Sequence, residues 1–343
     1  MAIGIYRREF ERMVKSRAGK RGEEGLVQAG EIPLAKTLAK KFKPPTRAQL
    51  ELVDAALAIH SEPDAAERAF IARQLVLCTL PHSDPGDSSP RWIRRTGNSA
   101  LLIQPGWDGD KDKSIGYPYG TIPRLLLFWA ITEAVRTKSR RLILGRSLNE
   151  FVRAVGLNPN TGGGKRSDSK RLKDQMRRLF RCHISFQATG TDPSGAPGEA
   201  WRDMAVAPEG ELWWHPHPDQ SALWESWIQL GEKFFSAVIA SPVPVDMRAL
   251  RALKRSPLAL DLYALISYRA FVIVQKNLPP QFISWEQLRS QLGTDYGDLK
   301  DFKKEANAAL RKIATVYPGL IITKAKGGFA IHASRLAVPQ KTQ

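Results

Sequence analysis

The stretch 284–333 constrains the possible fold more than any other part of the chain. Its beginning carries a helix start signal, because Ser284 is followed three residues later by Gln287 in the form of a capping box. A long basic helix over about 298–316 comes next, and two apolar runs then flank the basic, glycine-containing segment 324–328. This order of helix, turn, helix and hairpin predicts a winged-helix domain, which lays its second helix in the major groove of DNA.

The long helix is predicted to have one apolar and one basic face. The residues whose helical spacing turns them toward the core are Leu299, Phe302, Ala306, Ala309, Leu310, Ile313 and Val316. The opposite face carries Lys300, Lys304, Asn307 and Arg311. Asn and Arg suit the edges of adenine and guanine, and Lys suits phosphate. These four residues, with Lys324 and Lys326 at the tip of the hairpin, are therefore candidates for DNA contact. Basic helix faces are often merely solvated, but the order of elements, the basic hairpin and the second copy described below favour DNA.

The charge balance points to a polyanionic partner. The chain of 343 residues carries 52 Lys and Arg against 34 Asp and Glu, a formal net charge of +18, and nucleic acid is the partner that such an excess first indicates. No apolar run approaches the length of a membrane-spanning helix and the N-terminus lacks an apolar signal core, so we expect no membrane contact. The two cysteines, Cys78 and Cys182, lack the spacing of a zinc site. We expect reduced, buried thiols, a cytoplasmic protein, and neither metal nor cofactor.

The N-terminal region is predicted to be a basic arm followed by a helical hairpin. Residues 1–45 are basic and weakly patterned, which is typical of flexible arms that are attracted to phosphate. Thr46 then starts a helix whose apolar stripe should contain Leu50, Val53, Leu57 and Ile59. A second helix is expected over 63–80, with an inward face of Phe70, Ile71, Leu75 and Leu77.

The middle of the chain shows the same order of elements as the C-terminal stretch. After a hairpin over 92–104, a strongly apolar helix over 122–137 precedes a short strand at 141–144 and a capped helix that begins at Ser147. A glycine-rich loop leads to a second basic helix over 168–181 and then to a second hairpin. The basic residues of this loop and helix that should approach DNA are Lys165, Arg166, Lys170, Arg171, Arg177, Arg178 and Arg181.

The order of core helix, short strand, capped helix, basic helix and hairpin thus occurs at 119–214 and again at 256–333. We predict an α+β chain with two tandem winged-helix domains and an N-terminal helical, basic extension. A proline-rich segment at 241–246 should form a stiff connection between the two copies. The expected divisions are a basic arm at 1–45, a first winged-helix domain with its helical hairpin at 46–225, and a second winged-helix domain at 226–343.

Three runs carry a resemblance to a known family. They are GYPYGTIPRLLLFWAITEAVRTKSRRLILGRSLNEFVRAVGL, RLKDQMRRLF and PVPVDMRALRALKRSPLALDLYALISYR. They resemble the plasmid-encoded RepA replication initiators of Gram-negative bacteria, over about residues 34–333. The resemblance implies a protein that binds direct repeats, or iterons, in double-stranded DNA at a plasmid origin. It also implies origin opening, recruitment of host DnaA and the replicative helicase, and exchange between a monomer and a homodimer. The family supplies no short catalytic motif, so no catalytic residue is carried over.

Three patterns resemble catalytic or metal sites but depart from them in essential residues. His215 and His217 flank a proline, which spoils the strand on which the metal-binding histidine pair of a nicking initiator would lie. The segment 161–166 resembles the end of a P-loop, but its lysine is followed by arginine instead of Ser or Thr. Alternating aspartates at 108–112 resemble a calcium loop that lacks its final acidic ligand. We expect no enzymatic activity, and a metal-dependent origin-nicking enzyme is the catalytic alternative.

Two non-enzymatic alternatives stay open. In one, the protein is a transcriptional repressor with two winged helices, which would use the same DNA-contacting residues. In the other, the first winged helix is mainly a dimerisation surface and its basic face is secondary, an arrangement known among related initiators.

Overall fold

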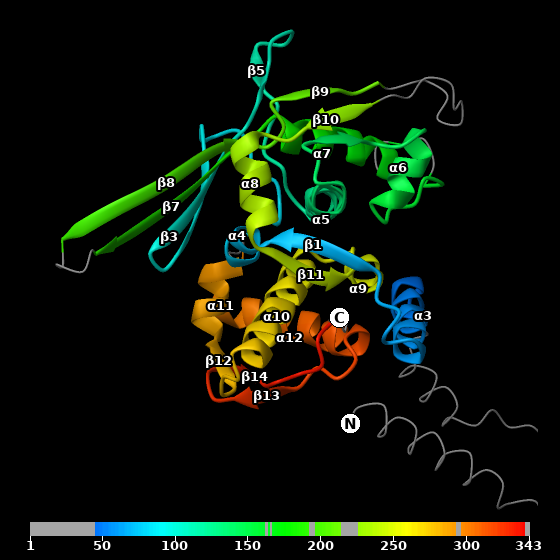
Figure 1. Cartoon of the computed structure of the whole chain (residues 1–343), viewed down its shortest axis with the longest axis vertical. Coiled ribbons are helices and arrows are strands. Elements are labelled where there is room, and N and C mark those ends of the chain that lie inside the picture. Colours follow the sequence, from blue (N-terminus) through cyan, green and yellow to red (C-terminus); the bar gives the residue numbers. More distant parts are fainter. Residues whose placement is uncertain are drawn as a thin grey trace, which may run out of the picture. The chain divides into compact units, whose positions relative to one another are not determined.

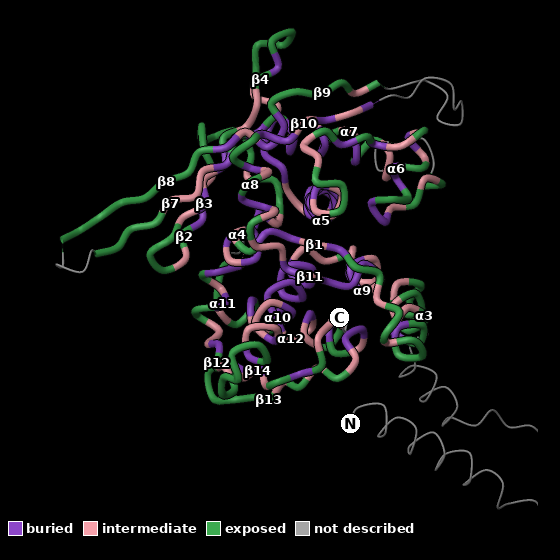
Figure 2. The backbone as a smooth tube through the Cα atoms, in the orientation of Figure 1, coloured by how far each residue is buried: buried purple, intermediate pink, exposed green. Residues whose placement is uncertain are grey.

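Two long buried helices, α5 (Thr121–Thr137) and α10 (Pro257–Gln275), form the centre of the fold (Figure 1). Burial is continuous over residues 122–131 in α5 and 258–267 in α10, as expected for helices that are apolar on all sides (Figure 2). Around them the chain is a mixed α+β structure, as predicted. The computed structural model describes residues 45–161, 164, 167–191, 196–213, 226–292 and 296–339.

Helix α10 corrects one expectation from the sequence. Its 19 residues are long and apolar enough to cross a membrane by length and composition, although no run was expected to reach that length. However, 67% of the apolar stretch is buried inside the protein. The apolarity of α10 is therefore explained by its place in the core.

The C-terminal unit, from α10 to β14, has the predicted order of elements. After α10 come β12 (Gln281–Ser284), α11 (Trp285–Leu292), α12 (Leu299–Val316), β13 (Ile322–Ala325) and β14 (Gly328–Ile331). The three strands form a sheet in the order β12-β14-β13, so the strand before α11 pairs with the hairpin that follows α12. Both predicted helix starts are confirmed: the Ser284 hydroxyl accepts the N–H of Gln287 at 3.0 Å, and the Asp298 carboxylate accepts the N–H of Asp301 at 2.7 Å.

The central unit, from α5 to β10, has the predicted order but a different pairing of strands. Its further elements are β6 (Arg141–Ile143), α6 (Leu148–Ala154), α7 (Asp168–Phe180), β7 (His183–Thr191), β8 (Pro197–Ala205), β9 (Glu209–Glu211) and β10 (Trp227–Gln229). Strand β6 pairs with β10 in the sheet β6-β10-β9. The hairpin β7–β8 instead joins β2 (Trp92–Thr96) and β3 (Ser99–Gln104) in the sheet β2-β3-β7-β8. The similarity between the two units thus lies in the order of elements and does not extend to the sheets.

The predicted helix over 63–80 is wrong. The structure has a strand there, β1 (Arg68–Ala72), and a single short helix, α4 (Arg73–Leu77). Strand β1 pairs in antiparallel register with β11 (Pro242–Asp246), so the expected stiff connection is also a strand. Short apolar runs do not distinguish a strand from a helix by periodicity, and here the pairing between distant segments decides.

The prolines of β11 fit this two-stranded sheet because it has free edges. Pro244 lies opposite Phe70, whose N–H points away from β11 and donates to the Thr132 hydroxyl of α5 at 2.9 Å. Strand β1 is therefore bonded to β11 on one side and to the core helix on the other.

The predicted apolar stripe of the first helix is mostly wrong. In α3 (Arg47–Ser61), Leu50, Val53 and Leu57 are exposed, with Leu57 65% exposed. Of the predicted stripe only Ile59 is buried, and it is buried together with Ala56 on another side of the helix. That side packs against α9 (Met247–Leu253) and α12. The helix has two apolar stripes, and its amino acids alone do not show which of them meets the core.

The remaining elements complete the surface. The hairpin over 92–104 is confirmed as β2 and β3, and a smaller hairpin, β4 (Trp107–Asp108) and β5 (Lys113–Ser114), follows it. Helix α8 (Glu232–Ala240) lies between β10 and β11 and contacts α5 and β8. Almost all of the predicted basic arm, residues 1–44, lies outside the described residues. The proposed domain boundaries stay predictions.

A buried charge cluster joins the central and C-terminal units. The guanidinium of Arg124 on α5 meets the carboxylate of Asp261 on α10 through two hydrogen bonds of 2.7 Å, and both residues are buried. His82 Nε2 lies 3.0 Å from the same carboxylate. The remaining N–H groups of Arg124 donate to the backbone carbonyls of Leu80, Pro81 and Gly120. All five donors of the guanidinium are thus used, which is the condition under which a buried arginine is tolerated.

Removing one member of this cluster should strongly destabilise the protein. We expect Arg124→Met to lower the free energy of unfolding by about 3–5 kcal/mol, because it leaves the Asp261 carboxylate buried without its cation. The double variant Arg124→Met/Asp261→Leu should recover part of this loss, since no buried charge is then stranded. Urea denaturation of both variants measures the effect, and a double variant that is no more stable than the single one would contradict it.

The same cluster predicts a pH dependence of stability. Burial holds the pKa of His82 below its ordinary value, because the protonated ring would lose its hydration. As the pH falls, the His82 ring is therefore protonated in the unfolded chain at a higher pH than in the folded protein. The free energy of unfolding should fall as the pH drops from about 7 to about 5. Burial alone would raise the pKa of Asp261, but the charge of Arg124 holds it below the ordinary value, so Asp261 does not titrate in this window.

A His82→Gln variant isolates that contribution. Glutamine keeps a donor for Asp261 and does not titrate. The free energy of unfolding of the variant should therefore vary less between about pH 7 and pH 5 than that of the parent protein. Urea denaturation at several pH values measures the slope. Equal slopes in the two proteins would assign the pH dependence to other groups.

Candidate nucleic-acid interface

The predicted DNA-facing side of α12 is accessible. Its apolar side is confirmed: Phe302, Ala306, Ala309, Ile313 and Val316 are buried. Lys300, Lys304 and Arg311 are exposed on the opposite side, and at 100° per residue they fall within about 40° of one another around the helix. Among the described residues, no carboxylate lies within ion-pair distance of these three. The structure therefore brings three of the four candidates onto one free basic face.

Asn307, the fourth candidate, is less available. It is half-buried, and its side-chain Nδ2 donates to the backbone carbonyl of Lys303 at 2.7 Å. Reading adenine takes both the donor and the acceptor of an asparagine amide. Asn307 would have to give up its contact with Lys303 before it could read a base in that way.

The tip of the C-terminal hairpin is a tight turn with two exposed lysines. Ala325 pairs with Gly328, which leaves Lys326 and Gly327 in the loop. Gly327 has a φ of 81°, in the region that favours glycine. A Cβ on Gly328 would lie 2.0 Å from the carbonyl oxygen of Ile283 on the neighbouring strand, so this position also requires glycine. Lys326 in the turn and Lys324 near the end of β13 are both exposed.

Helix α11 connects the hairpin tip to the start of α12. At its N-terminus, the N–H of Trp285 donates to the carbonyl of Gly327 in the hairpin tip at 3.0 Å. Near its C-terminus, the guanidinium of Arg289 donates to the carbonyls of Tyr296 and Gly297 at 3.2 and 3.3 Å. The hairpin tip that carries Lys326 and the segment just before α12 are thus both hydrogen-bonded to α11. The role of Arg289 was not predicted, because the carbonyls that it binds lie in a turn without a sequence motif.

The structure divides the candidates of the first basic helix, α7, into two groups. Lys170, Arg171 and Arg181 are exposed, and Arg171 lies 3.6 Å from the carboxylate of Asp168 in an ion pair within the helix. Arg177 instead pairs with Asp108 at 3.0 Å, and Arg178 pairs with Asp84 and Asp174 at 3.2 and 3.0 Å. The hydrogen bond from Arg177 holds the pKa of Asp108 below its ordinary value.

Arg178 is the more deeply enclosed of these two arginines. It donates to the backbone carbonyl of Tyr117 at 3.3 Å, and its guanidinium lies 5.3 Å from the centre of the Tyr119 ring. Arg177 therefore attaches α7 to strand β4, and Arg178 attaches it to the loops on either side, before α5. Lys165 and Arg166 lie outside the described residues.

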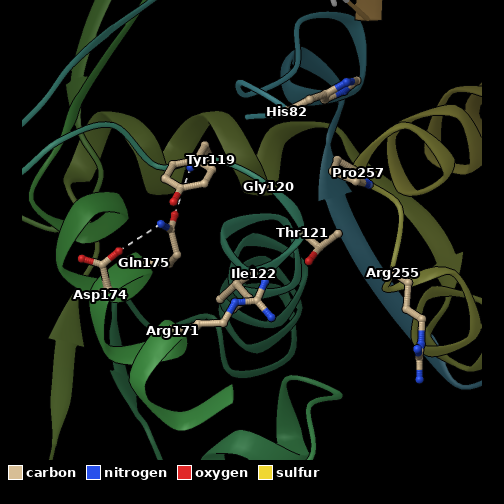
Figure 3. A pocket seen from close by; sticks show the side chains of 10 residues that line it. All are labelled: His82, Tyr119, Gly120, Thr121, Ile122, Arg171, Asp174, Gln175, Arg255 and Pro257. Atoms are coloured by element: carbon tan, nitrogen blue, oxygen red, sulfur yellow. Dashed lines mark hydrogen bonds between the residues drawn. The ribbon is translucent and has the colours of Figure 1, made fainter. Parts of the chain in front are cut away.

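Arg171 lines a polar cavity of about 290 Å³ at the junction of the central and C-terminal units (Figure 3). The cavity is bordered by the N-terminal residue of α5, Thr121, by His82, and by Arg255 and Pro257 at the start of α10. Figure 3 shows that Arg171 comes from α7 and Arg255 from the opposite wall. Arg171 is thus placed beside the other unit of the protein.

The patterns that resemble catalytic or metal sites lie only partly within the described residues. No group of three His, Cys, Asp or Glu side chains that could hold a metal ion occurs there, and His215 and His217 lie outside them. Cys78 and Cys182 are buried, as predicted. Burial raises the pKa of the Cys182 thiol to about 12, which keeps it in the unreactive protonated form.

Comparison with known proteins identifies similar structures and a matching family. Two solved structures of domains 2 and 3 of RctB are similar to the chain. One has a TM-score of 0.47 at 10% identity, covering 76% of this chain and 95% of the other; the second has 0.44 at 11% identity, covering 74% and 95%. No curated protein matches the sequence. Residues 117–287 match the model of a family described as plasmid-encoded RepA protein, and the chain belongs to that family.

Proposed function

We propose that the protein is a plasmid replication initiator that binds repeated sites in double-stranded origin DNA and has no catalytic activity of its own. The observation that carries this proposal is the C-terminal unit, in which α11, α12 and the β13–β14 hairpin have the order and sheet pairing of a winged helix. Its second helix presents a free basic face. The family provides the link to plasmids.

In this proposal α12 lies in the major groove. Arg311 contacts a guanine edge, since its planar guanidinium can bond two acceptors of one base. Lys300 and Lys304 contact phosphates near the N-terminal half of the helix, and Lys324 and Lys326 contact the backbone beside it. These phosphate contacts supply most of the affinity, so binding should weaken steeply with salt.

The central unit has a supporting role in DNA binding. Lys170 on α7 and Arg181 at its C-terminus are exposed and would contact the phosphates of an adjacent turn of the same duplex, together with Arg171 if it leaves its ion pair with Asp168. Arg177 and Arg178 are already engaged within the protein, so α7 offers fewer contacts than α12. The smaller number of available basic residues on α7 favours the alternative in which the central unit serves mainly in dimerisation. Exchange between a monomer and a homodimer is part of the proposal. Recruitment of host DnaA and of the replicative helicase follows from the same proposal.

Footprinting on the DNA upstream of its own gene, at physiological salt, tests this function. We expect regularly spaced protection over direct repeats, which would also give the repeat length. Protection of one palindrome would identify a dimeric repressor instead. Binding that disappears with competitor DNA, without any footprint, would mean that the basic surface attracts DNA generally and reads no sequence.

Base reading and phosphate contact can be separated by two substitutions. Arg311→Ala should weaken binding to the cognate repeat by about 1–3 kcal/mol and leave binding to random DNA nearly unchanged. Lys326→Ala should weaken both complexes equally and reduce the slope of log K against log salt by about 1. Titrations of the two DNAs over a range of salt concentrations give these values.

Lys312→Ala is the matched control for Arg311. Lys312 is the next residue on α12 and is also exposed, but it points about 100° further round the helix. Its removal should therefore have the small, uniform effect of a lost charge. If Lys312→Ala changed the preference for the cognate repeat as much as Arg311→Ala, the reading face of α12 would lie elsewhere than we propose.

A further inference from the structure

Strand β2, at the edge of the sheet β2-β3-β7-β8, is attached to the last turn of α11. The Thr96 hydroxyl donates to the carbonyl of Ser290, and the Ser290 hydroxyl donates back to the carbonyl of Arg95, both at 3.4 Å. Strand β2 belongs to the sheet that contains the β7–β8 hairpin of the central unit. A part of the protein without any predicted DNA contact is therefore joined to the helix that precedes α12.

The strongest contacts of this attachment meet at one atom. The carbonyl oxygen of Leu292, the last residue of α11, accepts a hydrogen bond from the Thr79 hydroxyl at 3.1 Å and another from Nη1 of Arg94. The same Nη1 donates to the Thr79 hydroxyl at 2.6 Å. Arg94 is 6% exposed and Thr79 is 3% exposed, so solvent hardly screens these bonds.

A guanidinium is well suited to this position. The last carbonyls of a helix lack partners within the helix and carry the negative end of its dipole. Arg94 supplies both a donor and a positive charge there, while Thr79 fixes the direction of the carbonyl. The C-terminus of α11 is thus held from outside its own unit.

This position matters because α11 sets the place of α12. Leu292 immediately precedes the connection to α12, and Arg289, one turn earlier in α11, binds the carbonyls of Tyr296 and Gly297 just before α12 begins. A rotation of the end of α11 would therefore move the start of α12. Contacts to base edges require positioning to about 0.5 Å, whereas a lysine can follow a phosphate over a longer distance.

The attachment also continues into the centre of the fold. Thr79 is followed by Leu80, Pro81 and His82, the segment that binds Arg124 and Asp261. One short segment thus contacts the end of α11 through its first residue and the cores of both units through the next three.

We propose that Arg94, together with Thr79, is a positioning residue for sequence reading: it holds the end of α11 so that α12 presents its basic face in the orientation that fits base edges. The inference rests on the proposed function, because it assumes that α12 reads DNA. Loss of Arg94 reduces the preference for the cognate site, while general binding through phosphates is retained.

The test compares Arg94→Met with Arg95→Met. Arg95 is the next residue on β2, is exposed, and carries the same charge, so the control has the same net charge and composition. The measured quantity is the ratio of the dissociation constants for a random duplex and for the cognate repeat, at one salt concentration and well below the unfolding temperature. Arg94→Met should lower this ratio about tenfold, comparable to the loss of one good base contact, and Arg95→Met should leave it unchanged.

Two milder variants keep the test valid if Arg94→Met unfolds. Thr79→Val removes the second donor to Leu292 at nearly constant volume and should lower the ratio by a smaller factor. Arg94→Lys keeps the charge at the end of α11 but has no planar fork, so its ratio should lie between those of the parent protein and Arg94→Met. A ratio that stays at the parent value in all three variants while thermal stability falls would overturn the proposal, because Arg94 would then be only structural.

Hydrogen exchange without DNA separates this inference from the proposed function. In Arg94→Met, amide exchange should accelerate in the second turn of α12, residues 303–306, and stay unchanged in the middle of α10. Equal acceleration in both helices would indicate general destabilisation and overturn the inference. A parent protein that shows no preference for any origin sequence would overturn the proposed function, and the exchange result would still decide whether Arg94 positions α12.

Discussion

The structure depends on a guanidinium that two units share. Arg124 projects from the first turn of the apolar helix α5 and reaches Asp261 on the equally apolar α10. A charge in such a place is stable only when every donor is satisfied, and three backbone carbonyls before α5 complete the set. The position of α5 therefore fixes the position of α10. It also fixes the path of residues 80–82, which a purely apolar contact between the helices would leave less defined.

This constraint bears directly on the proposed binding of DNA. A protein that contacts two turns of one duplex must hold its two contact faces at a set separation, because a small rotation between them moves one face off the groove. The shared charge cluster and the contacts of β2 with α11 restrict that rotation at separate points. The paired arginines of α7 have a similar effect, since Arg177 and Arg178 attach this helix to the segment that precedes α5. The geometry between units is thus built from polar contacts with fixed directions, laid over a continuous apolar core.

The sequence predicts the parts of this fold that are encoded locally. The limits and faces of α12 follow from a cap at Asp298 and a regular apolar spacing, and the tip of its hairpin follows from Gly327 and Gly328. Where the outcome depends on a distant partner, the prediction fails. The segment 68–72 is apolar enough for a helix but pairs with β11, and α3 buries Ala56 and leaves Leu57 exposed. Arg124 and Asp261 are 137 residues apart, so no local pattern could have joined them. Of the candidate site, the accessible face of α12 was predictable, whereas the engagement of Arg177 and Arg178 was not.

The engagement of arginines within the fold also affects how the chain's positive charge is interpreted. An excess of 18 charges suggests an extensive basic surface, yet several arginines serve the fold. Arg94, Arg124 and Arg178 each bind backbone carbonyls as well as side chains. Arginine is favoured in such places because its five donors lie in a rigid plane and can satisfy more oxygens in fixed directions than the three donors of a lysine ammonium. The exposed basic residues of α12 and its hairpin tip are mostly lysines, which suit phosphate, and Arg311 is the arginine among them. The two basic residue types are thus used according to their chemistry. Most of the arginine contacts stabilise the fold, and the lysines of α12 and its hairpin tip remain available for the proposed contacts with DNA.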